Sequence, residues 1–287
     1  MALTADLRHA ARLLVRSPIF TITSVISLAL GIGAAATIFS LTDALLFEPT
    51  VGVRNPAEVV DIGRANRGSG FDNMSHPAFT YMRDHSQTLN MAAVDFGGRP
   101  VSLSSKGGSE RLILTLVSGN YFDVLGTRTA LGRFFRPDED RVPGDPPVVV
   151  LGHALWATRF NSDPTILEQP LVLNNREFAV VGVAEPGFQG SSMIGTDLWA
   201  PMAMVQVARG EVSSSLLTEP RSVWHVAIGR LKPGVPIEQA EAELNTLIEA
   251  YKKVEPRFPD HHTVRLATMG RIPGPVRTPF LAFIGFL

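Results

Sequence analysis

The sequence predicts an α+β protein in which an N-terminal transmembrane helix is followed by a two-lobed mixed α/β extracytoplasmic domain. Three observations lead to this prediction. Residues 17–42 contain no charged side chain. Three arginines precede this run, and two acidic residues follow it. From Pro49 to about Pro275, short apolar segments alternate with amphipathic ones between Gly and Pro turns, which is typical of a mixed α+β fold.

Composition excludes several classes of function. The chain has 287 residues and a formal net charge of -1, whereas nucleic-acid binders usually carry a strong basic excess. No nucleic-acid partner is therefore expected. Cysteine is absent, which excludes a disulfide framework, a thiolate nucleophile and a cysteine metal site. The sequence has no G-x-x-x-x-G-K-[ST] loop, so we do not expect this chain to hydrolyse ATP.

Residues 1–17 are predicted to form a cytoplasmic amphipathic helix. Arginine recurs every fourth residue on one face, while apolar side chains line the other. Such a basic amphipathic helix suits a membrane surface, with membrane lipid as its partner. The arginines are Arg8, Arg12 and Arg16, and the apolar residues are Leu3, Leu7, Ala10 and Leu14.

Residues 18–46 are predicted to form a transmembrane helix. The uncharged stretch 18–42 would make a helix about 37 Å long, which exceeds a bilayer core of about 30 Å. The segment Gly31–Ala36 also matches the G-x-G-x-x-G/A fingerprint of a dinucleotide fold. However, such a fold requires a strand of only about 5–6 residues directly before the first glycine. Here the apolar run begins at Pro18, far upstream of Gly31. A signal peptide has an apolar core of about 7–15 residues near the start, whereas this run is longer and begins at residue 18. A buried core helix is the remaining alternative.

The small residues of this helix are a candidate contact with another membrane helix. Gly31, Gly33 and Ala34 would let a neighbouring helix approach closely, although small residues that merely face lipid explain the pattern as well. The arginines before the span, against Asp43 and Glu48 after it, place the N-terminus in the cytoplasm. The main domain is then extracytoplasmic, and the fragment crosses the membrane once.

The long domain, residues 47–275, shows a succession of strands and short helices. The pattern predicts a hairpin around Asn174–Asn175, because Asn tolerates the left-handed conformation of such turns. It also predicts a helical turn opened by 118–120 and stopped by Gly126. The predicted strands are 58–64, 91–96, 111–117, 147–151, 171–173, 178–183, 197–201, 223–230 and 263–269, and the predicted helices are 77–86 and 154–160.

The clearest element is a helix that starts at Pro236. Pro suits the first helical position, and Lys252 and Lys253 complement the C-terminal end of the helix dipole. The apolar stripe consists of Ile237, Ala240, Leu244, Leu247, Ile248 and Tyr251. Residues 279–287 are wholly apolar and too short to span a bilayer, so we expect them to be the start of a second transmembrane helix.

Several polar groups resemble sites but are interpreted as ordinary structure. The pair His261–His262 has no second ligand pair at a metal-binding spacing, which favours a solvated loop. His76 and His85 are expected at the surface. The acidic run 138–140 is expected to be a solvated turn, and Arg64 and Arg67 are expected in a mobile loop. No catalytic, cofactor or metal residue is predicted, and no cofactor is expected.

At this point five segments show a resemblance to a known family. The chain resembles permease subunits of the MacB/FtsX/LolCE class of ABC transporters, including the duplicated orphan permeases, and specifically their MacB-like periplasmic core domain. The segments are DLRHAARLLVRSPIFT with SLALGIGAAATIFS, VSGNYFDVLGTRTALGRFFRPDED, VVVLGHALWATRFNSDPTILEQPLVLNNREFAVVGVAEPGF, DLWAPM and GRLKPGVPIEQAEAELNTL.

The resemblance implies an architecture. It implies a periplasmic domain with a split lobe of about 50–130 and 222–270, and an inserted lobe of about 131–221. Members of the family continue with three further membrane helices that form an FtsX-like permease domain. Because this sequence stops at Leu287, the chain is expected to be a truncated permease.

The resemblance also implies a role. It implies a non-enzymatic component of an efflux or lipoprotein-extrusion system in the cell inner membrane, which couples ATPase-driven conformational change to the periplasmic side. The expected partners are a separate ABC ATPase subunit, a second permease copy in a dimer, a periplasmic adaptor or lipoprotein, and membrane lipid. The alternative is a membrane-anchored binding or sensory domain without transport activity.

Overall fold

The computed structural model describes residues 17–46, 51–95, 97–105, 108–191, 195–210 and 215–270. The chain divides into two compact units, 1–48 and 49–287, which are described separately below. The predicted amphipathic helix, apart from Ser17, and the predicted second membrane segment at 279–287 lie outside the described residues.

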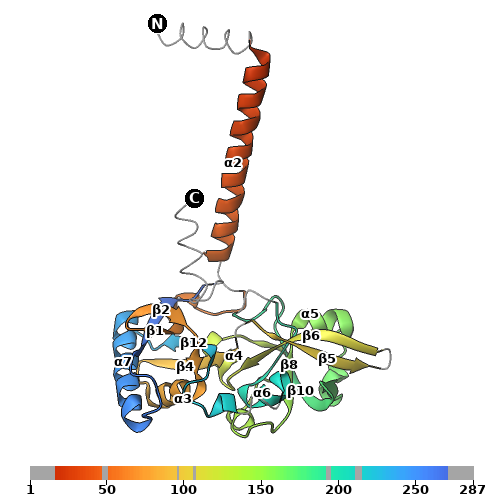
Figure 1. The fold of residues 1–287 in the computed structure, drawn as a ribbon. Helices are drawn as coiled ribbons and strands as arrows, with labels where there is room; N and C mark the ends of the chain where they lie inside the picture. The colour runs from red at the N-terminus through yellow and green to blue at the C-terminus, as the bar shows by residue number, and fades with distance from the viewer. Residues whose placement is uncertain are drawn as a thin grey trace. The chain divides into compact units, whose positions relative to one another are not determined.

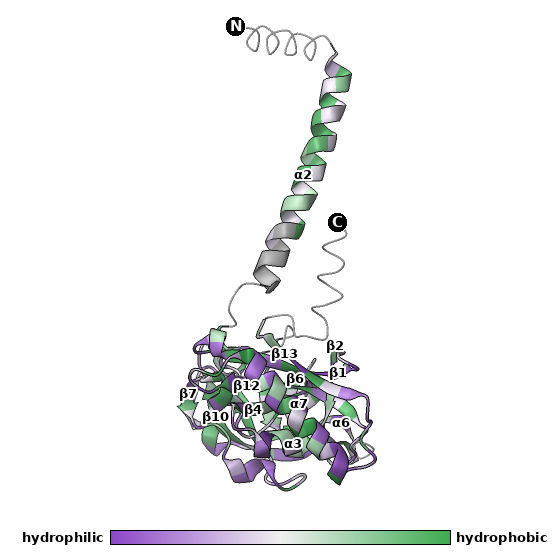
Figure 2. Cartoon of the chain, turned by 90° about the vertical axis from the view of Figure 1, so that its left-hand side faces the viewer, coloured by the Kyte–Doolittle hydropathy of each residue, from purple (hydrophilic) through white to green (hydrophobic). Residues whose placement is uncertain are grey.

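The first unit contains one long helix, α2 (Pro18–Leu46). Pro18–Ile38 is long and apolar enough to cross a membrane, and none of it is buried; apolar colours follow this part of the helix (Figure 2). The hydroxyls of Thr21, Thr23 and Thr37 donate to carbonyls four residues earlier at 3.0, 3.0 and 2.8 Å. These polar groups are thus satisfied within the helix, as a hydrocarbon surrounding requires.

Four antiparallel strands form the first part of the sheet in the second unit. Their order is β4 (Leu89–Val94), β12 (Val223–Leu231), β1 (Val59–Asn66) and β13 (His262–Thr268). Buried side chains line both faces of these strands. Helices α3 (His76–His85) and α7 (Ile237–Val254) pack on one face, and α4 (Tyr121–Leu125) packs on the other (Figure 1).

Six further strands close into a ring. Each strand pairs with the next, and the last, β5, pairs again with the first, β6. Such closure leaves no unpaired sheet edge among these strands. Around the ring, the strands are β6 (Gly108–Val117), β11 (Leu198–Pro201), β8 (Val148–Leu151), β10 (Arg176–Ala184), β9 (Leu171–Leu173) and β5 (Arg99–Ser105).

Shorter elements surround both parts of the sheet. Helix α5 lies at the ring end of the unit, whereas α7 lies at the opposite end (Figure 1). The remaining helices are α5 (His153–Arg159), α6 (Val205–Arg209), η1 (Pro56–Glu58), η2 (Pro137–Asp140), η3 (Pro164–Glu168) and η4 (Met202–Met204). The remaining strands are β2 (Ser69–Asp72), β3 (Met74–Ser75) and β7 (Thr129–Gly132).

Strand β6 connects the ring to the four-stranded part, because its last residue, Val117, pairs with Val94 of β4. A cluster of buried aromatic side chains fills the junction, including Phe122 and Trp199 with ring centroids 5.6 Å apart. The predicted lobe boundaries stay a prediction. Strands β5 and β6, which those boundaries assign to the split lobe, are hydrogen-bonded to β9 and β11 of the predicted insertion.

Candidate functional site

The small-residue segment predicted from the sequence lies in the middle of α2. A phosphate-binding loop connects a strand to a helix, whereas Gly31, Gly33 and Ala34 are all inside one continuous helix. The dinucleotide interpretation is therefore wrong. A Cβ added at Gly31 or Gly33 would meet nothing within 4 Å. Contact of this surface with a partner helix stays a prediction.

The junction of the two sheet parts contains a buried carboxylate held by two arginines. Asp95 follows β4 directly, and its side chain is fully buried. Arg209, at the end of α6, donates from Nη2 to Oδ1 at 2.6 Å and from Nε to Oδ2 at 3.2 Å. Arg99, at the start of β5, donates from Nε to Oδ2 at 3.2 Å. One carboxylate thus ties together three elements, and we call this set the Asp95 clamp.

The clamp extends to β12 through an aromatic ring. The guanidinium of Arg209 lies 5.0 Å from the centroid of the Trp224 ring, a distance at which the cation is attracted to the ring. The indole Nε1 of Trp224 donates to the carbonyl oxygen of Leu216 at 3.0 Å. The ion pairs of the Asp95 clamp and the packing of Arg209 on Trp224 therefore link the ring strands to β12, an inner strand of the four-stranded part.

Next to Trp224, two imidazole rings lie against each other at the start of α3. His225 is fully buried, and its ring centroid is 5.5 Å from that of His76. Burial lowers the pKa of His76 to about 3 and that of His225 to about 4. The expectation that His76 is a surface residue holds only in part, because the residue is half-buried and its Nδ1 is buried. His85 is exposed, as expected.

His262 is also inside the protein, so the solvated-loop interpretation is wrong for this residue. It belongs to β13 and is 6% exposed. Arg64 of β1 donates to its Nε2 at 3.0 Å and also pairs with Asp72 at 3.0 Å. Arg64 is therefore a structural cation of the sheet and not part of a mobile loop. Burial, followed by the charge of Arg64, lowers the pKa of His262 to about 4.

The acidic run 138–140 holds loops together, so the solvated-turn interpretation is wrong for two of its three residues. Glu139 is buried and accepts from Arg133 at 2.6 and 2.9 Å and from the backbone N–H of Arg136 at 2.8 Å. Asp140 accepts from the N–H groups of Gly119 and Ala203, both at 2.9 Å. Burial raises the pKa of Asp140 to about 6.

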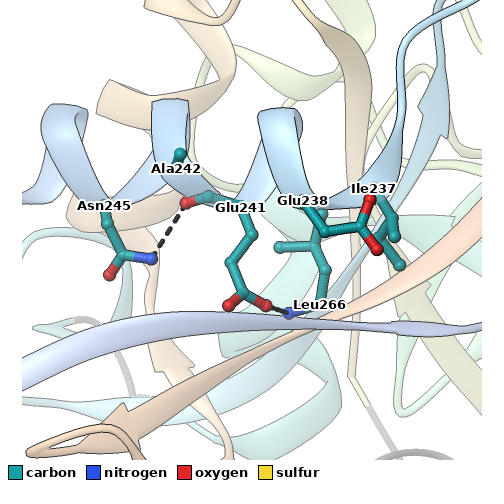
Figure 3. Close-up of a pocket in the computed structure, with 6 residues that line it drawn as sticks. All are labelled: Ile237, Glu238, Glu241, Ala242, Asn245 and Leu266. Atoms are coloured by element: carbon teal, nitrogen blue, oxygen red, sulfur yellow. Dashed lines mark hydrogen bonds between the residues drawn. The ribbon is translucent and has the colours of Figure 1, made fainter.

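A groove of about 280 Å³ runs between α7 and β13. Figure 3 shows Glu241 of the helix bonded to the backbone of the strand at Leu266. Asn245 donates to the carbonyl oxygen of Val264 and accepts from its N–H, both at 2.9 Å. Glu241 accepts from the N–H of Leu266 at 2.7 Å. These contacts cover polar groups at an edge that could otherwise pair with another strand.

Sequence reasoning missed the Asp95 clamp and the histidine pair. No spacing rule connects Asp95 with Arg209, because the contact depends on how β4 and α6 meet in space. His225 did have a signal, since it is a polar residue inside the apolar run 223–228. Within the described part of the chain, no group of three or more His, Cys, Asp or Glu side chains could hold a metal ion.

Comparison with known families decides the membership of the chain. Residues 21–247 match the model of the family described as the MacB-like periplasmic core domain. The chain belongs to this family. The resemblance found in the sequence and the predicted fold class are confirmed. The family is a domain of ABC-type, permease-like transporters and is generally not catalytic. Among curated proteins, no significant match to the chain was found.

Solved structures show the same fold at low sequence identity. A domain of a protein described as a permease from Porphyromonas gingivalis has a TM-score of 0.55 and 17% identity, covering 77% of this chain and 94% of its own. The periplasmic region of MacB from Actinobacillus actinomycetemcomitans has a TM-score of 0.53 and 16% identity, and the match covers 82% of this chain and 97% of that region. The extracellular domain of the noncanonic ABC-type transporter YknZ from Gram-positive bacteria has a TM-score of 0.51 and 10% identity, and the match covers 72% of this chain and 99% of that domain.

Proposed function

We propose that this MacB-like chain is a membrane component of an ABC-type efflux or lipoprotein-extrusion system. A separate ATPase would drive a conformational change that the domain transmits to the extracytoplasmic side. The observation that carries the proposal is the combination, in one chain, of the family's domain with an apolar helix of 29 residues. At about 1.5 Å per residue such a helix is long enough to span a bilayer.

The junction supports mechanical coupling as the role of the domain. Three elements converge on the buried Asp95, so a displacement of the ring strands would be transmitted to β4 and β12 through charged contacts. Buried ion pairs have strict geometric requirements, which favours a rigid transfer of motion over an independent swing of each part.

The decisive experiment asks whether an ATPase associates with the chain. The chain is purified from native membranes in mild detergent, and ATP hydrolysis in the eluate is measured. We expect a co-purifying ATPase, since the chain has no phosphate-binding loop of its own. If the chain is inserted but never recovered with ATP hydrolysis, the binding or sensory alternative replaces the transport proposal.

We further propose that Gly31, Gly33 and Ala34 contact a helix of a second permease copy or another permease segment. Replacing both glycines by Leu should leave membrane insertion intact and reduce recovery of the associated subunits. Replacing the nearby Ile32 by Leu is the control, since it adds no bulk. If the unchanged chain, the double glycine variant and Ile32→Leu all recover the associated subunits equally, Gly31, Gly33 and Ala34 do not form the proposed contact.

Orientation is tested separately with reporters. We propose that the N-terminus is cytoplasmic and that the domain lies on the periplasmic side of the inner membrane. A reporter that is active only in the periplasm, fused after Tyr251, should be active. Activity of only a cytoplasmic reporter at the same residue would reverse the proposed topology.

A further inference from the structure

Two histidine rings whose centroids are 5.5 Å apart each carry a buried nitrogen that has no hydrogen-bond partner among the described residues. The Nδ1 of His225 lies 3.1 Å from the carbonyl oxygen of Val226. Because a carbonyl can only accept, Nδ1 carries the proton and Nε2 carries the lone pair. That Nε2 is buried and unpartnered, as is the Nδ1 of His76. Leaving a buried acceptor unpaired costs about 1–3 kcal/mol.

We propose that His76 and His225 bind one soft monovalent metal ion, Cu(I), through these two nitrogens. A metal–nitrogen bond of about 2.0 Å to each ring places the two ring centroids roughly 5.5–6.5 Å apart, depending on the angle at the metal. The observed separation is 5.5 Å, with the ring planes at 75°. The bond from Nδ1 of His225 to a carbonyl is the usual way in which a protein fixes a metal-binding tautomer.

The number of ligands selects the ion. Structural zinc requires four protein ligands, and catalytic zinc generally three. No third His, Cys, Asp or Glu joins this pair within the described residues. Imidazole is a good ligand for copper, and the monovalent d10 ion accepts two ligands. Phe79 and Trp224 flank His225 at 5.4 and 5.0 Å, and they shield the site from water.

The surrounding charges permit a cation. The two guanidinium groups that face the pair are compensated, because Arg209 pairs with Asp95 at 2.6 Å and Arg83 pairs with Asp84 at 2.8 Å. The low pKa values of both histidines mean that their lone pairs are free at neutral pH. Binding therefore requires no proton release. His76 is only half-buried, which gives the ion a route of entry.

The test titrates the full chain in detergent micelles with Ag(I), an air-stable ion of the same charge, in chloride-free buffer with free imidazole as competitor. Calorimetry should give one tight site per chain, and tryptophan fluorescence should fall because Trp224 adjoins the site. His76→Gln should weaken binding by roughly tenfold or more. The matched control, His85→Gln, changes an exposed histidine on the same helix and should bind like the unchanged chain.

Equal Ag(I) affinity of His76→Gln and the unchanged chain, or no tight site in either, would overturn the proposal. Circular dichroism of His76→Gln establishes that the variant is folded. A nitrogen-15 spectrum of the histidine rings adds a second readout. A shift of the His225 Nε2 resonance on adding Ag(I) supports the site. If the spectrum instead shows a hydrogen bond between the two rings that Ag(I) does not change, the two nitrogens are hydrogen-bond partners of each other, and the metal site is overturned.

Discussion

The carboxylate of Asp95 is the side chain whose removal we expect to be most destabilising among the charged residues described. Asp95→Ala would leave Arg99 and Arg209 without their fully buried counter-charge, and Arg209 is itself largely buried. Breaking a buried pair in this way typically costs about 3–5 kcal/mol. We predict a loss of about 3 kcal/mol in the free energy of unfolding, measured by urea titration.

The matched control is Asp84→Ala. Asp84 also pairs with an arginine, at 2.8 Å, but its side chain is 52% exposed. Exposed pairs contribute less than about 1 kcal/mol, so this variant should unfold almost like the unchanged chain. Similar losses in the two variants would show that the Asp95 clamp is no stronger than a surface contact.

The buried His262 should make stability depend on pH. Its pKa is about 4 in the folded chain and about 6.5 when unfolded. The unfolded chain therefore takes up the proton first as pH falls. The stabilisation is complete above pH 6.5 and disappears towards pH 4, with about 2 kcal/mol lost at pH 5. Asp140, with its pKa raised to about 6, acts in the opposite direction between pH 4 and 6.

His262→Gln isolates this contribution because glutamine can still accept from Arg64 but does not titrate. The free energy of unfolding of this variant should fall less steeply between pH 6.5 and 5 than that of the unchanged chain. His85→Gln, at an exposed position, should retain the original slope. An unchanged slope in His262→Gln would mean that the histidine titrates normally in the folded protein.

At the scale of elements, the amide of Asn245 replaces a neighbouring strand for β13. It forms both bonds that a strand would form with Val264. Asn245→Leu keeps the branching at Cγ but leaves these backbone groups without their partner. We predict a loss of about 1–3 kcal/mol and concentration-dependent association through the strand edge. Denaturant titration measures the loss of stability, and light scattering with size-exclusion chromatography measures the association.

Thr246→Ala is the control for this element. Its hydroxyl bonds only within α7, to the carbonyl of Ala242 at 3.0 Å, and is exposed. The variant should remain monomeric and nearly as stable as the unchanged chain. If Asn245→Leu behaves in the same way, the edge of β13 needs no cover from α7.

Elements with a strong local signal were predictable, and those that depend on neighbours were not. Asn174 and Asn175 adopt φ of 49° and 64°, as a tight hairpin turn between β9 and β10 requires, and Gly126 ends α4 with φ 70°. The apolar stripe of α7 indicated its buried face. Strand β5 was missed, because Arg99–Ser105 contains Pro100 and three serines and has little strand propensity. Its pairing with β6 overrides that propensity.

The polar sites were the least predictable features, because they depend on how elements far apart in the sequence meet in space. His76 and His225 are brought together by β12 and α3, which are far apart in the sequence. The apolar run around His225 is buried on both faces, so alternation could not show which way its ring points. Composition and the uncharged run, in contrast, require no tertiary information, and they predicted the long apolar helix α2.

At the scale of the whole molecule, the last third of the chain completes a sheet that starts near residue 59. β12 lies between β4 and β1, and β13 pairs with the other side of β1. α7 covers these strands, and its Glu243 accepts from the N–H groups of Gln87 and Thr88 at 2.7 and 3.1 Å. The domain should therefore fold as one unit only when its first strands, β1 and β4, and its last elements, β12, α7 and β13, are all present.

We predict that the fragment 49–275 is soluble, monomeric and cooperatively folded, whereas 49–219 aggregates or loses its cooperative thermal transition. Ending the chain at 219 removes β12 from between β4 and β1, so both strands lose the partner that they share. It also removes nine large buried apolar side chains, each of which contributes about 1.5–3 kcal/mol. That sum is at least comparable to the whole stability of a typical domain, about 5–15 kcal/mol. The residues are Trp224, Val226, Ile228, Leu244, Ile248, Tyr251, Phe258, Val264 and Leu266.

The fragment 49–270 is the control for shortening as such, because it ends just after β13 and keeps every described element of the domain. Calorimetry should give it the same sharp transition as 49–275. The fragment 49–219 should show a broad transition or none, because the apolar faces of β4 and β1 are left without their cover. If 49–219 instead melts as sharply as the longer fragments, β12, α7 and β13 form a separate folding unit. The split-lobe architecture would then have to be abandoned.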